Sequence, residues 1–79
     1  MAGADIEIAG ALVHETPRAI LFSDKGEEAS AVWIPRGAVR ALHPTGRDTV
    51  ITLRGGQKRR VAAVIITVSE HTAYQKGLI

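Results

Sequence analysis

Residues 49–68 read TVITLRGGQKRRVAAVIITV, in which two apolar runs flank a double glycine. The first run, residues 49–53, is β-branched and alternates in polarity, which is typical of a strand. Gly55 and Gly56 accept the positive φ angles of a tight turn. The second run, residues 60–68, is apolar at both parities, and such a strand lies at the centre of a sheet or meets another chain. The stretch therefore predicts a β-hairpin whose second strand is buried on both faces.

The N-terminal part of the chain predicts three more strands. Residues 6–14 alternate in polarity, and their apolar parity is formed by Ile6, Ile8, Leu12 and His14. Gly10, in the middle of this run, suggests a bulge or a bend. Residues 18–23 and 30–34 are short apolar runs on either side of a turn signal at residues 24–26, which indicates a second hairpin.

The C-terminal part predicts a break, a strand and a helix. Residues 39–42 fit either a short strand or a helical turn, and Pro44-Thr45-Gly46 predicts a break before the next strand. Ser69 has the chemistry of a helix N-cap, and a helix over residues 70–76 would end at Gly77, the usual left-handed residue after a helix.

Five or six short strands at about ten-residue spacing, followed by one helix, predict a mainly β domain. We expect residues 1–79 to form a single domain, a small five- or six-stranded SH3-like or OB-like barrel with a short C-terminal helix. Phe22 and Trp33 lie in predicted strands and are expected in the core. Tyr74 is expected to cover one end of the barrel.

The composition excludes several classes of protein. The chain has no cysteine, which removes disulfides and thiolate metal sites. It contains no run near the roughly 20 apolar residues that a membrane helix needs. Residues 1–5 carry no basic stretch before an apolar run, so we expect no signal peptide. These features predict an intracellular protein with no membrane segment.

The residues capable of catalysis do not form a recognisable pattern. A nucleophile needs a base nearby, and the base needs an orienting group. The candidates, apart from scattered carboxylates, are Ser23, Ser30, Ser69, His14, His43 and His71. None stands in a nucleophile-elbow, zinc-protease, phosphate-loop or dinucleotide-binding signature. We therefore expect no enzyme, no metal and no cofactor.

Charge is distributed unevenly along the chain. Residues 1–35 hold six acidic and two basic side chains, whereas residues 36–79 hold eight basic and two acidic ones. Such asymmetry marks a surface that faces a polyanion, or it pairs the two halves with each other. The sequence leaves both interpretations open.

The densest basic segment is residues 54–60, RGGQKRR, which surrounds the predicted hairpin tip. The planar guanidinium of arginine matches phosphate oxygens, so this segment is a candidate phosphate contact. The predicted contact residues are Arg54, Lys58, Arg59 and Arg60, joined by Arg36 and Arg40 if their loop lies nearby. The alternative is a solvated turn whose cations protect a strand edge. Because the aromatic residues are expected in the core, nucleic acid would be bound through its backbone, with little sequence preference.

Three segments resemble, in the same order, those of a group of small phage and prophage proteins with no assigned activity. The segments are Val13-His14-Glu15-Thr16, Val32-Trp33-Ile34-Pro35-Arg36 and Lys76-Gly77-Leu78-Ile79. The resemblance covers most of the chain and is weakest over residues 41–65, where this chain carries an additional basic hairpin. It implies a viral or mobile-element source, and hence the cytoplasm of a bacterial host.

Small phage proteins of this kind commonly act by binding, and the resemblance implies the same mode of action for this chain. We predict a non-enzymatic accessory protein that binds nucleic acid or a host nucleoprotein complex through the basic hairpin. The alternative is an anti-CRISPR-like inhibitor that binds a bacterial defence complex. A third possibility is a self-associating component, a homodimer formed through Val61 to Val68.

Overall fold

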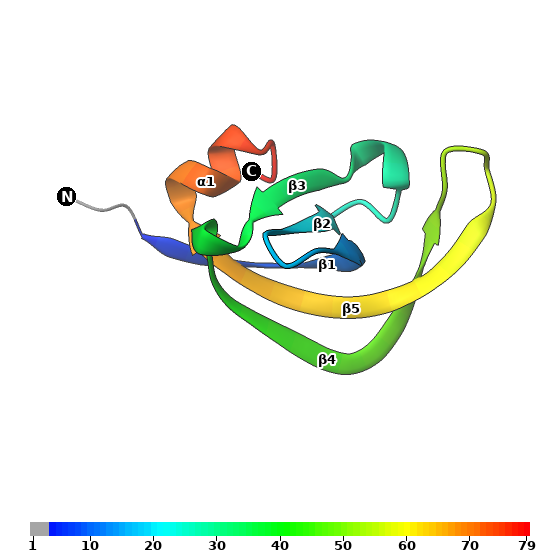
Figure 1. Cartoon of the computed structure of the whole chain (residues 1–79), viewed down its shortest axis with the longest axis horizontal. Coiled ribbons are helices and arrows are strands. Elements are labelled where there is room, and N and C mark those ends of the chain that lie inside the picture. Colours follow the sequence, from blue (N-terminus) through cyan, green and yellow to red (C-terminus); the bar gives the residue numbers. More distant parts are fainter. Residues whose placement is uncertain (1–3) are drawn as a thin grey trace.

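The computed structural model describes residues 4–79, which form one five-stranded antiparallel sheet and a short helix (Figure 1). The strand order is β3-β2-β1-β5-β4. The elements are β1 (Asp5–Glu15), β2 (Ala19–Ser23), η1 (Glu28–Ser30), β3 (Val32–Pro35), η2 (Arg36–Ala38), β4 (Val39–Thr52), β5 (Lys58–Ser69) and α1 (Glu70–Gln75). The mainly β class and the C-terminal helix predicted from the sequence are confirmed.

Strand β5 lies in the interior of the sheet, between β1 and β4, as its apolar sequence predicted. It pairs with β1 from Asp5↔Ser69 to Leu12↔Ala62 and with β4 along its other edge. The turn between β4 and β5 is closed by the Leu53 amide, which donates to the Gln57 carbonyl at 2.7 Å. The predicted hairpin is therefore confirmed.

The predicted break at Pro44-Thr45-Gly46 is wrong, because β4 runs through it as one bent strand (Figure 1). Between the pairs Pro44↔Val64 and Asp48↔Ala62, β4 holds more residues than β5, so the extra residues bulge outward. The Thr45 hydroxyl donates to the Ala63 carbonyl at 2.7 Å and so replaces a bond of the ladder. Because β4 is an edge of the sheet described for residues 4–79, the missing proline N–H is tolerated there.

The irregularity in β1 lies at Val13 rather than at Gly10. Leu12 pairs with Phe22 and His14 with Leu21, so Val13 is an extra residue in its strand. This bulge moves His14 off the apolar parity, and its side chain is exposed. Gly10 is instead covered by the Phe22 ring.

The core has two parts, on opposite faces of β5. The larger cluster consists of Ile20, Phe22, Ile34, Val64, Ile66, Val68, Ala73 and Leu78. The smaller cluster consists of Ala11, Val13, Ile51 and Val61. Val61 and Val64 differ in strand parity, which is why each joins a different cluster. A 79-residue chain thus buries apolar side chains on both faces of one interior strand.

The helix boundaries follow the predicted caps. The Ser69 hydroxyl accepts the Thr72 amide at 3.1 Å. Gly77 has φ of 71°, and the Leu78 amide donates to the Ala73 carbonyl at 2.8 Å, which closes a Schellman motif. Leu78 is buried against the larger cluster. No helix within residues 4–79 is both long enough and apolar enough to cross a bilayer.

The aromatic residues divide between core and surface. Phe22 is fully buried, as predicted. The prediction for Trp33 is wrong, because 46% of its surface is exposed. Tyr74 is 74% exposed, so Ala73 rather than Tyr74 is the residue that α1 places in the core.

Candidate binding groove and basic hairpin

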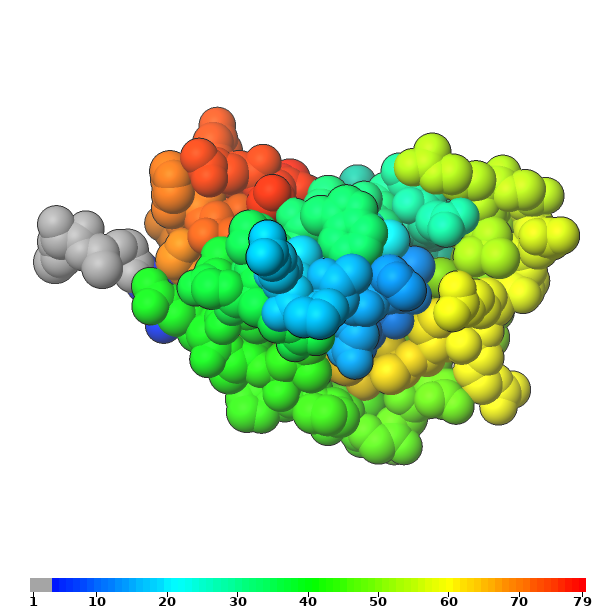
Figure 2. All heavy atoms as spheres, viewed as in Figure 1, coloured from blue at the N-terminus to red at the C-terminus, as the bar shows by residue number. Residues whose placement is uncertain are grey.

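A groove opens where β1 and β5 part from each other. Their ladder ends at Leu12↔Ala62, and its register, if continued, would place Glu15 opposite Arg59. Instead, the bulge at Val13 turns β1 toward β2, where Glu15 pairs with Ile20. The hollow between the strands, here called the β1–β5 groove, has a volume of about 330 Å³ and is lined by Leu12, Val13, His14, Glu15, Arg59, Arg60, Val61 and Ala62. In Figure 2 the end of β1 (blue) and the start of β5 (yellow) border each other on the visible face.

The cations of the hairpin are exposed and lie on both of its faces. Arg54, Lys58, Arg59 and Arg60 are all exposed. Residues paired across two strands lie on the same face of the sheet, and successive residues lie on opposite faces. Arg59 pairs with Ile51, so Arg59 lies on the face of the smaller core cluster, which contains Ile51. Lys58 and Arg60 lie on the opposite face. Arg59 and Arg60 both line the β1–β5 groove, although they belong to opposite faces of the hairpin.

Backbone contacts attach the hairpin to the segment that follows β2. The Thr52 amide donates to the Gly26 carbonyl at 2.9 Å, and the Arg54 amide donates to Glu28 Oε1 at 3.0 Å. Lys58 Nζ donates to Thr52 Oγ1 at 2.7 Å. The acidic Glu28 therefore holds the backbone of the turn rather than a guanidinium. Within residues 4–79, no hairpin cation forms an ion pair.

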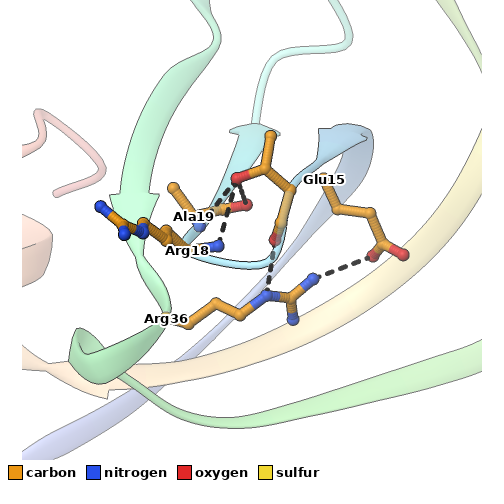
Figure 3. A network of polar contacts seen from close by, with 5 residues as sticks. Glu15, Arg18, Ala19 and Arg36 are labelled. Carbon is orange, nitrogen blue, oxygen red and sulfur yellow. Dashed lines mark hydrogen bonds and ion pairs between the residues drawn. The ribbon is translucent and has the colours of Figure 1, made fainter.

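Arg36 lies at the β1 end of the groove (Figure 3). Its Nε donates to the Thr16 carbonyl at 2.8 Å, and its Nη2 is 3.6 Å from Glu15 Oε2. The Thr16 hydroxyl in turn accepts the Arg18 and Ala19 amides and fixes the β1–β2 turn. Arg36 thus compensates the charge of the one acidic side chain that lines the groove in the described chain.

Arg40 does not join the other cations. It lies 3.7 Å from Asp5 Oδ1, and Asp5 pairs with Ser69 at the helix end of the sheet. Figure 1 shows this end and the β4–β5 hairpin at opposite ends of the molecule. The structure therefore brings Arg54, Lys58, Arg59 and Arg60 together, places Arg36 beside the groove and separates Arg40 from both.

Sequence reasoning missed an aromatic pair next to the groove. His14, Leu21 and Trp33 are cross-strand neighbours on β1, β2 and β3. The His14 and Trp33 rings meet edge to face, with centroids 6.1 Å apart and planes at 90°. His14 also lines the groove, so the exposed indole adjoins it. The available signal was Pro35, because a proline in a strand indicates an edge, where alternate side chains reach solvent.

The remaining catalytic candidates have structural partners or lie apart. Ser23 is buried, and its Oγ accepts the Lys25 and Glu27 amides at 3.3 and 3.2 Å. Ser69 caps α1. The three histidines lie on β1, β4 and α1, and the described part of the chain has no group of three metal-ligating side chains.

Two other hollows contrast with the groove. One, of about 290 Å³, lies over Ala9, Gly10, Ala63 and their neighbours, and the other, of about 340 Å³, lies beside His71 and Tyr74. Neither has a lysine or arginine among its lining residues in the described chain.

No family model, curated protein or solved structure matched this sequence. The resemblance to phage proteins therefore stays a prediction.

Proposed function

We propose that this protein is a non-enzymatic phage or prophage accessory protein that binds nucleic acid, alone or within a nucleoprotein complex, through the basic hairpin of residues 54–60. The supporting observation is the concentration of cations at this turn. Arg54, Lys58, Arg59 and Arg60 lie within seven residues, and their exposed side chains have no carboxylate partner in the described chain. Unpaired arginines and lysines at a protruding turn are the chemistry that phosphate contacts use.

The proposal includes the barrel class, SH3-like or OB-like, and a bacterial cytoplasm as the place of action. A single parallel bridge, Glu27↔Thr52, supports a barrel, because it brings the end of β4 against the segment after β2. Small barrels of these types present strand faces and loops to oligonucleotides.

A homodimer through Val61 to Val68 would have to form by side-chain contacts and not by pairing of backbone edges. Residues 62–68 already lie between β1 and β4, whose ladders occupy both edges of β5. The free edges of the described sheet are those of β3 and β4.

The test is binding of labelled DNA and RNA oligonucleotides by fluorescence anisotropy over a series of salt concentrations. The variant Arg59→Glu/Arg60→Glu removes two cations of the groove. The control Lys25→Glu/Arg47→Glu makes the same change in net charge at exposed positions outside the hairpin. Circular dichroism checks that both variants fold.

We expect the groove variant to lose affinity and the control to retain most of it. The slope of log affinity against log salt should fall by about 0.7 for each phosphate of a single strand that the variant no longer neutralises. Equal losses in the two variants would reduce the effect to net charge and overturn the proposed contact. The inhibitor alternative would be supported by a different result: no oligonucleotide binds, and the tagged protein captures from host lysate one stoichiometric protein complex that survives nuclease treatment.

A further inference from the structure

We propose that the ligand of this surface is single-stranded nucleic acid, with one base stacked on Trp33 and the adjoining backbone passing along the β1–β5 groove toward Arg59 and Arg60. This inference rests on the proposed function and names its substrate class. It also revises the expectation of backbone contact alone, which assumed a buried Trp33.

The first support is the exposure of the indole. Trp33 is the single tryptophan of the chain, and it leaves 46% of its surface open on the edge strand β3. The His14 ring lies edge to face against it. An exposed aromatic ring is the element that single-strand binding proteins use to stack bases.

The second support is the continuity between this ring and the cations. Trp33 stands two strands from β1, which is about 10 Å at the usual spacing of a sheet. Phosphates of one strand follow each other at about 3.4 Å along a helix axis and farther apart in an extended strand. A few nucleotides therefore span the distance from a base on Trp33 to a phosphate in the groove.

The third support is the lining of the groove. Its walls carry Arg59 and Arg60 on β5, and the one carboxylate among its described lining residues, that of Glu15, is compensated by Arg36. Val13 and Val61, which are buried in the smaller cluster, also line the groove. A phosphate backbone thus meets two guanidinium groups without carboxylate partners in the described chain, and the negative charge beside them is compensated.

A duplex does not fit the aromatic element, because its base faces are covered by stacking and become available only by unpairing. The fluorescence of Trp33 tests this directly, since no other tryptophan contributes. We expect thymidine and uridine oligonucleotides to quench the emission. An abasic strand of equal length and a duplex should bind, if at all, without this quenching.

Variants separate stacking from charge. Trp33→Ala should weaken binding of the thymidine strand by about 5- to 150-fold, the range for removing one stacked base, and should leave abasic-strand affinity unchanged. Trp33→Phe should retain most of the affinity. Tyr74→Ala is the matched control, because Tyr74 is exposed on α1, away from the groove.

The outcomes distinguish the two proposals. Equal affinity for thymidine and abasic strands, without quenching, would overturn stacking and leave the hairpin contact standing. If neither strand binds at low salt, both proposals fail. If Trp33→Ala does not fold, the quenching of the unmodified protein and the affinity of Trp33→Phe still decide the question.

Discussion

The close contact between Gly10 and Phe22 yields a sharp prediction about stability. A Cβ built on Gly10 would lie 2.5 Å from Phe22 Cζ and 2.5 Å from the Ser23 carbonyl oxygen. Phe22 is fully buried in the larger cluster, so its ring has no free direction in which to move. The carbonyl belongs to the backbone of β2, which is paired with β1. Gly10→Ala therefore forces a displacement of the sheet or of the core.

The expected cost is about 2 kcal/mol. Extra methyl groups in a packed core typically cost about 1 to 3 kcal/mol, which outweighs the few tenths to 1 kcal/mol that a Gly→Ala change gains from the unfolded chain. A chain of 79 residues has a free energy of unfolding of about 4 to 12 kcal/mol. The variant should stay folded, with its melting temperature lower by about 8 to 16 °C.

Urea unfolding followed by circular dichroism measures this loss. With a slope of about 1 to 2 kcal/mol per molar urea, the midpoint should fall by about 1 to 2 M. Gly37→Ala is the control, because a Cβ there meets nothing within 4 Å and the residue has no positive φ. Its stability should stay within about 0.5 kcal/mol of the unmodified protein. Equal stabilities for the two variants would refute the close packing of Phe22 over Gly10.

Three further changes test other contacts. Ser23→Ala removes the buried acceptor of the Lys25 and Glu27 amides and should cost about 1 to 3 kcal/mol in urea unfolding; a neutral result would mean that other groups satisfy these amides. Gly77→Ala places a Cβ at φ of 71° and should cost about 1 kcal/mol by thermal melting, whereas an unchanged melting temperature would contradict the Schellman end of α1. Arg40→Ala breaks an exposed ion pair with Asp5 and should change stability by less than about 1 kcal/mol, so a larger loss would show that this pair does more than the structure indicates.

The elements with local signals were predicted well. The double glycine set the β4–β5 hairpin, and Gly56 has φ of 85° in its turn. Ser69 and Gly77 set the ends of the helix through hydrogen bonds between near neighbours in sequence. The apolar run of β5 predicted its place in the interior of the sheet, because a strand that is apolar on both faces is typical of such a position.

The errors arose where a distant segment decides the outcome. Pro44 does not end β4, because the Thr45 hydroxyl bonds to Ala63 and an outward bulge absorbs the extra residues. Such a repair is invisible in the sequence of β4 alone. Trp33 lies between two apolar neighbours, so alternation along the strand could not show which face of the sheet its side chain is on. That became clear only from its pairing with Leu21. Of the candidate site, the four hairpin cations were predicted, whereas the groove and its aromatic neighbour were not.

The groove lies where the smaller core cluster meets the end of the β1–β5 ladder. Val13 packs in that cluster with Ile51 and Val61, and at Val13 β1 takes up an extra residue and leaves β5. That departure opens the groove beside Arg59 and Arg60 and carries His14 toward Trp33.

The ion pairs of the structure bear on the uneven charge of the two halves of the chain. The acidic half does pair with the basic half, but the ion pairs of the described residues join Glu15 to Arg36 and Asp5 to Arg40. Both basic partners, Arg36 and Arg40, therefore lie outside the hairpin. Pairing between the halves and a surface for a polyanion are thus compatible, because the first compensates the acid that lines the groove and leaves the cations of the hairpin available for the second.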